Sequence, residues 1–161
     1  MEQTRELVVA GQLAVATEPG SVLTCAGLGS CVAVVLRCPA AAVAGVAHVM
    51  LPASPPGEPA DPYRYADRAV PALIEAVRGH AGEAAVEALI AGGATLPGLP
   101  EADAIAARNL EAVLSQLSIA GVAVHAQATG GEGAQTISVE LIDGTPVTVR
   151  EPGGRTYALG S

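Results

Sequence analysis

Two apolar runs in the N-terminal half of the chain constrain its fold most strongly. Val32–Leu36 is unbroken, and after the interruption CPAAA a second, mostly apolar run covers Val43–Leu51. Successive side chains of a strand point to opposite faces of its sheet, so a strand that is apolar at every position is buried on both faces. The two runs therefore predict a β-hairpin in a sheet that is covered on each side.

The remaining patterns predict helices and further strands around this hairpin. Asp61-Pro62 has the residue types of a helix N-cap and first turn, and apolar residues then recur at helical spacing until Gly79. Pro71 lies inside this stripe, so the helix begins later or bends there. A second helix is expected from about Asp103 to Ala120. Further strands are expected at residues 6–16, 18–24, 122–128, 137–142 and 146–149, and at 85–94, where a helix fits nearly as well.

These elements show no internal repeat and no domain boundary. Length and pattern together predict one α+β domain over residues 1–161, with a mixed β-sheet or β-sandwich core and helices packed on its outer faces. The segment 52–62 contains five prolines and is expected to be a surface loop, either bordering a substrate cleft or simply connecting two elements.

Composition excludes several classes of function. The net charge is −8 and the eight basic residues are scattered, which argues against a nucleic-acid partner. The sequence contains no apolar stretch long enough to cross a bilayer, and the first ten residues do not have the pattern of a secretory signal. Three cysteines, an odd number, do not make a disulfide framework, so we expect a cytoplasmic protein without membrane insertion.

Cys31 is the strongest candidate for a catalytic residue. Free cysteines are usually buried core residues, and Cys25 and Cys38 are expected to be so. Cys31 instead follows a glycine-rich turn, in which the backbone N–H groups of Gly29 and Ser30 are candidate donors to a thiolate or an oxyanion. His48 lies near the end of the second run, so the hairpin would bring it to the same edge as Cys31, as in a thiolate–imidazolium pair.

Other sites are not supported by the residue spacing. Cysteines at 25, 31 and 38 do not have the spacing of zinc ligands, and the Gly-x-Gly at 27–29 lacks the residues of a nucleotide-binding loop. His80 falls at the end of a helix and His125 inside a strand, and neither is expected to be catalytic. We expect no cofactor and no metal.

Several segments resemble the chemotaxis protein CheD family, the chemoreceptor glutamine deamidases. The most specific are GLGSCVAVVL and GVAHVMLP, at residues 27–36 and 45–52. The resemblance extends along almost the whole chain through RYADRAVPALIEAV, IAGGA, ARNLEAV and TGG, which begin at residues 64, 90, 107 and 129.

The resemblance implies a protein-glutamine glutaminase, an amidohydrolase acting on methyl-accepting chemoreceptors. It implies that Cys31 attacks the side-chain amide carbon, that His48 is the general base and acid, and that a thioester intermediate is then hydrolysed. It also implies a CheC-type phosphatase as a possible partner. The competing hypothesis is a catalytically weak chemotaxis adaptor that binds receptors or this phosphatase.

The sequence departs from the family pattern in two places. The family has a threonine six residues before the nucleophile, thought to orient the histidine, whereas this chain has Cys25 there and Thr24 one step earlier. Neighbouring strand residues point to opposite faces, so only one of these two can face His48 unless a bulge intervenes. After residue 131 the chain also has Glu132, Gly133 and Gln135 where the family commonly has asparagine and arginines.

Overall fold

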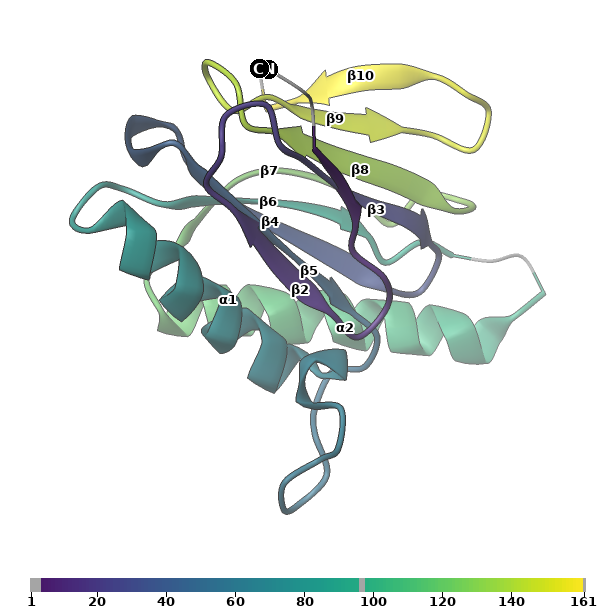
Figure 1. The fold of residues 1–161 in the computed structure, drawn as a ribbon. Helices are drawn as coiled ribbons and strands as arrows, with labels where there is room; N and C mark the ends of the chain where they lie inside the picture. Colours follow the sequence, from purple (N-terminus) through teal and green to yellow (C-terminus); the bar gives the residue numbers. More distant parts are fainter. Residues whose placement is uncertain (1–3, 96–97, 161) are drawn as a thin grey trace.

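The computed structural model describes residues 4–95 and 98–160, and it has two mixed five-stranded sheets and two α-helices (Figure 1). The first sheet has the order β1-β3-β8-β9-β10 and the second has the order β2-β5-β4-β6-β7. The first sheet consists of Arg5–Leu7 (β1), Val22–Leu28 (β3), Gln135–Glu140 (β8), Val147–Arg150 (β9) and Thr156–Leu159 (β10). The second consists of Leu13–Ala16 (β2), Val32–Cys38 (β4), Val43–Val49 (β5), Glu87–Gly92 (β6) and Ala123–Thr129 (β7).

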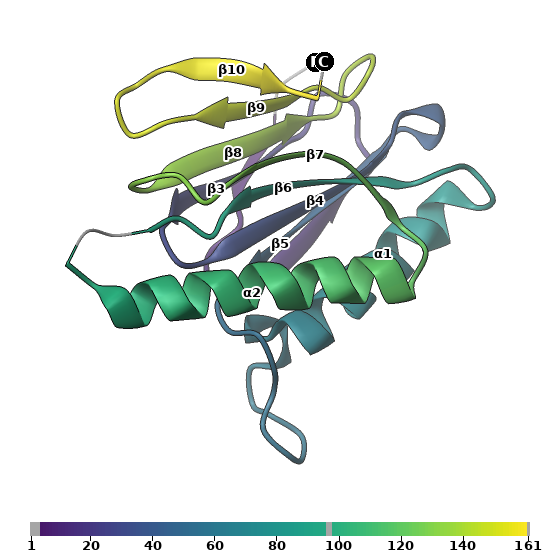
Figure 2. The ribbon, with the colours of Figure 1, turned by 180° about the vertical axis from the view of Figure 1, so that it is seen from behind.

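The two sheets pack face to face, and both helices cover the outer face of the second sheet (Figures 1 and 2). The helices are Ala66–Ala81 (α1) and Pro100–Ile119 (α2). Strands β4 and β5 are buried at every position, as their apolar runs predicted. The even-numbered residues of β4 pack against the helices, and the odd-numbered residues face the other sheet.

The α+β class and the central hairpin are confirmed, but several features of the architecture differ from expectation. No helix covers the outer face of the first sheet within the described residues, because β8 and β9 place alternate, more exposed side chains there. The stretch 6–16 is not one strand: Gly11 adopts a φ of +81°, and the chain crosses from the first sheet to the second at this turn. Strand β10 was not predicted.

The first helix also begins later than Asp61-Pro62 suggested. Residues 62–64 form a short 3₁₀ turn, and α1 starts at Ala66 with Tyr65 as its N-cap residue. Residues 52–61 project beyond the helices, away from the two sheets (Figure 1). Ser54 anchors the base of this loop, because its backbone N–H and its hydroxyl both donate to the Asp67 carboxylate at 2.9 Å. None of the helices in the described residues is long and apolar enough to cross a membrane.

Candidate functional site

The register of the β4–β5 hairpin brings Cys31 and His48 to one end of the space between the sheets. Ala33 lies opposite His48 in this antiparallel pair, so their side chains share a face. Cys31 precedes Ala33 by two residues and packs against the same inter-sheet cluster. Extending this register by one residue beyond β4 makes the nucleophile candidate and the imidazole diagonal neighbours, and the Cβ atoms of such pairs lie about 7 Å apart.

The ring of His48 is held by a backbone carbonyl. Its Nδ1 lies 3.0 Å from the oxygen of Val8, in the segment that follows β1. A carbonyl can only accept, so Nδ1 carries the proton and the neutral ring has its lone pair on Nε2. His48 is only 5% exposed, so this bond fixes both the tautomer and the orientation of an almost buried imidazole.

Cys25, and not Thr24, lies beside this histidine. The Cys25 thiol donates to the same Val8 oxygen at 3.5 Å, whereas the Thr24 hydroxyl lies 2.9 Å from that of Ser138 on the outer face of the sheet. The irregularity of β3 comes after Cys25 and does not reverse Thr24. Of these two residues, Cys25 is therefore the one that faces His48. It offers a weak thiol donor in place of a hydroxyl.

Burial disfavours the thiolate form of both thiols at the site. It raises the pKa of the half-buried Cys31 thiol above its ordinary value. For Cys25, burial, with a smaller contribution from the nearby Cys31, raises the pKa from 9.0 to about 12. Burial therefore opposes the formation of the expected thiolate–imidazolium pair, which stays a prediction.

The turn before Cys31 leaves two backbone donors available. The N–H of Gly29 is already used, since it donates to Gly27 O at 3.0 Å. The N–H groups of Ser30 and Cys31 have no acceptor among the residues that the structure describes. Of the backbone donors expected around residues 29–31, those of Ser30 and Cys31 are therefore the remaining candidates for an oxyanion.

Gly92 lies against the backbone of Cys31, the candidate nucleophile. It has a φ of +97°, and a Cβ at this position would collide with the backbone oxygen of Cys31. The next residue, Gly93, donates its N–H to that same oxygen at 2.9 Å. Gln135 holds Gly92 from the other sheet, because its Oε1 accepts the Gly92 N–H at 3.0 Å. The glycine pair thus permits the close approach that positions Cys31.

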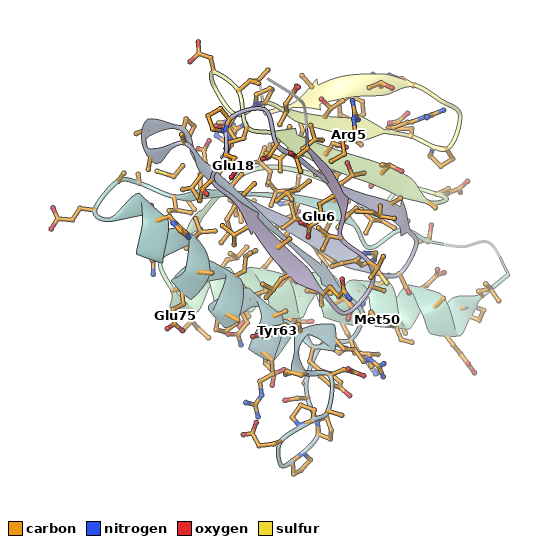
Figure 3. All side chains as sticks on the ribbon, in the orientation of Figure 1. Arg5, Glu6, Glu18, Met50, Tyr63 and Glu75 are labelled. Atoms are coloured by element: carbon orange, nitrogen blue, oxygen red, sulfur yellow. The ribbon has the colours of Figure 1, made fainter. Side chains whose placement is uncertain are left out.

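Asn109 lies near the site and belongs to the segment ARNLEAV, which carries part of the family resemblance but was not expected to contribute a site residue. It belongs to α2, is fully buried, and its Nδ2 donates to Ser30 O and to Met50 O, each at 2.9 Å. Figure 3 labels Met50 where β5 leaves the sheet. The available signal was a polar residue within the buried stripe that also contains Ala106 and Val113.

The remaining candidates lie elsewhere. Cys38 packs on the helix side of β4, at the end of the strand far from Cys31. His80 is exposed in the last turn of α1, and His125 is partly exposed beside Glu87. Among the described residues no group of three or more His, Cys, Asp or Glu side chains is arranged to hold a metal ion. A pocket of about 410 Å³ lies between α1 and α2, and Cys31 is not among the residues that line it.

Comparison with known proteins gives this geometry a context. The family described as CheD chemotactic sensory transduction matches residues 50–151, more than half of the chain. The chain belongs to the CheD family. A relative from Thermotoga maritima, named chemoreceptor glutamine deamidase CheD, is 40% identical over 151 residues, which cover 93% of this chain and 94% of the relative.

Two further relatives are named probable chemoreceptor glutamine deamidase CheD. That of Methanococcus vannielii is 36% identical over 88% of this chain and 91% of its own length. That of Symbiobacterium thermophilum is 38% identical over 86% of this chain and 88% of its own length. The family match begins at residue 50, just after His48. The similarity of the preceding segment of this CheD-family chain to known proteins is therefore shown by the individual relatives.

Proposed function

We propose that this chain is a chemoreceptor glutamine deamidase that acts in the cytoplasm. It would hydrolyse the side-chain amide of glutamines in methyl-accepting chemoreceptors, converting each glutamine to a glutamate residue of the receptor and releasing ammonia. One observation carries the proposal beyond family membership: a half-buried thiol lies diagonally across a hairpin from an imidazole whose free nitrogen is Nε2. This pairing provides a nucleophile and a base at one site.

The first half of the reaction forms a thioester. His48 Nε2 accepts the proton of the Cys31 thiol while the sulfur bonds to the amide carbon, and the carbonyl π pair moves onto oxygen. The N–H groups of Ser30 and Cys31 are the donors available to this oxyanion. The imidazolium then protonates the amide nitrogen, the C–N bond breaks, and ammonia leaves.

The second half regenerates the thiol. His48 Nε2 takes a proton from a water that attacks the thioester carbon, and the same backbone donors face the second oxyanion. The C–S bond breaks, the imidazolium returns the proton to sulfur, and a glutamate side chain is released. Holding Nδ1–H on the Val8 oxygen keeps Nε2 as the only nitrogen that exchanges protons in both halves.

A second candidate function is a catalytically weak adaptor that binds receptors or a CheC-type phosphatase. Cys25 favours it, because its thiol bonds to Val8 O at 3.5 Å where the family resemblance implies a threonine hydroxyl. A thiol is the weaker donor, so support for the histidine is reduced. An adaptor would co-purify with the receptor fragment and release no ammonia from it.

Ammonia release from a purified receptor cytoplasmic fragment tests the proposal. Wild type should release ammonia, and Cys31→Ala should release none while its thermal unfolding remains cooperative. Cys38→Ala is the matched control, because it removes a buried thiol from the far end and other face of β4. Equal release by wild type and Cys31→Ala would remove this sulfur from the reaction.

A further inference from the structure

A buried amide from α2 holds the peptide bond that immediately precedes Cys31. Asn109 Nδ2 donates one hydrogen to Ser30 O and the other to Met50 O, both at 2.9 Å. In the hairpin register Met50 continues the pairing of Val49 with Val32, which sets it opposite Cys31. One side chain therefore joins the turn that carries the sulfur to the strand that carries the histidine.

The bond to Ser30 O also fixes the direction of the next N–H. A trans peptide is planar, so the carbonyl of Ser30 and the N–H of Cys31 point in opposite directions. Asn109 comes from α2, which packs on the face of β4 that holds Val32 and Val34. Drawing the Ser30 oxygen toward this helix turns the Cys31 N–H away from it. The Cys31 side chain packs on that same opposite side.

The chemistry of the acceptors settles the orientation of the Asn109 amide. Ser30 O and Met50 O can only accept, so the NH₂ group must face them. Asn109 Oδ1 has no partner among the described residues although it is buried. An unpaired buried oxygen lowers the stability of the fold. The two hydrogen bonds of Nδ2 offset part of this loss.

We propose that Asn109 is a positioning residue that directs the Cys31 N–H toward the oxyanion of the reaction. The proposal rests on the proposed function for its biological substrate. Asn109 acts through the Ser30–Cys31 peptide and touches neither the substrate nor the sulfur. Without it the peptide is free to rotate, and the N–H loses its alignment while the sulfur and His48 remain in place.

Two reactions of Cys31 separate this role from a general effect on the fold. Acylation by 4-nitrophenyl acetate passes through a tetrahedral intermediate whose former carbonyl oxygen is an oxyanion. Alkylation by iodoacetamide displaces iodide directly and forms no oxyanion. Loss of oxyanion alignment lowers only the first. Rates would be measured for wild type, Asn109→Ala and Asn109→Ser, with Cys31→Ala for background. Val113→Ala, in the same buried stripe one turn later, is the control for lost packing.

The acylation-to-alkylation ratio should fall at least about tenfold in Asn109→Ala, because removing an oxyanion donor slows comparable enzymes 10²- to 10³-fold. Asn109→Ser, which keeps one O–H donor, should lie between that variant and wild type. Val113→Ala should lower the unfolding temperature and leave the ratio unchanged. An unchanged ratio in Asn109→Ala, or an equal fall of both rates, would overturn the proposal.

A measurement on the wild-type chain does not depend on the variants folding. A glutamine-like peptide aldehyde would form a hemithioacetal with Cys31, and the amide proton of Cys31 should shift downfield as it bonds to the new oxygen. No shift would contradict the assignment. Ammonia release from the receptor fragment is recorded in parallel. If no ammonia is released while the acylation-to-alkylation ratio still depends on Asn109, the proposed receptor substrate is wrong and the positioning role of Asn109 is supported.

Discussion

Cys25 and His48 share one hydrogen-bond acceptor. The thiol of Cys25 and Nδ1 of His48 both point to the carbonyl oxygen of Val8, at 3.5 and 3.0 Å. The oxygen is supplied by a backbone that is fixed in turn, since the Val8 N–H donates to Thr24 O at 2.7 Å. The histidine is therefore oriented mainly by a main-chain group, with Cys25 as a weak second donor to the same oxygen.

This arrangement predicts how position 25 affects the rate. Cys25→Thr places a stronger donor beside Val8 and His48, and we expect kcat for receptor deamidation to rise by about tenfold, the lower end of such supporting interactions. Cys25→Val has nearly the shape of threonine but no donor, so its kcat should stay close to wild type. A threonine variant no faster than the valine variant would show that Val8 alone orients the ring.

Cys25 should also make stability fall at alkaline pH. Its thiol has a pKa of 9.0 when unfolded and of about 12 when folded, because burial raises the pKa. Between these values the folded state holds one more proton, so the free energy of unfolding falls with rising pH, by up to about 1.4 kcal/mol per unit. Urea unfolding from pH 8 to 10.5, compared with Cys25→Val, isolates this slope. Parallel curves for the two proteins would contradict it.

The pH dependence of Cys31 alkylation tests how the nucleophile is activated. Burial raises the pKa of this thiol, so the rate with iodoacetamide should keep rising beyond pH 9. A preformed thiolate–imidazolium pair would instead give a plateau that begins well below neutral pH. His48→Gln should reduce deamidation strongly and leave the alkaline part of this profile in place. A plateau in wild type that disappears in His48→Gln would restore the ion pair.

Gly92 should be intolerant of a side chain for a reason specific to the site. Gly92→Ala adds the strain of a positive φ and a collision with the Cys31 oxygen, so both the unfolding temperature and the deamidation rate should fall. Gly121→Ala is the matched control, because its φ of +71° carries similar strain while its Cβ would meet no atom within 4 Å. Equal losses of activity in the two variants would mean that the approach to Cys31 has no special importance.

The parts of the fold that follow from side-chain pattern were predictable. Val32–Leu36 is apolar without interruption and Val43–Leu51 is mostly apolar, which predicts the hairpin and its burial, and with them the nearness of Cys31 and His48. The first helix began late because Asp61-Pro62 belongs to a separate 3₁₀ turn. Strand β10 is short and mostly exposed, so it leaves little apolar pattern to read.

The supporting groups of the site were harder to predict, since several act through the backbone. Every residue has a backbone carbonyl, so the residue type of Val8 does not predict that its oxygen orients His48. Gln135 and Asn109 bond to main-chain atoms of residues more than forty positions away, and only the tertiary structure brings these together. For Asn109 the signs in the sequence were its place in the segment ARNLEAV and a polar position within the buried stripe of α2.

Mass spectrometry of receptor peptides is the most direct test of the central claim. A chemoreceptor cytoplasmic fragment would be incubated with wild type or with Cys31→Ala, digested, and searched for glutamines converted to glutamate. We predict conversion at specific glutamines with wild type and none with Cys31→Ala at equal protein concentration. No conversion by wild type, or the same conversion by the variant, would contradict the account.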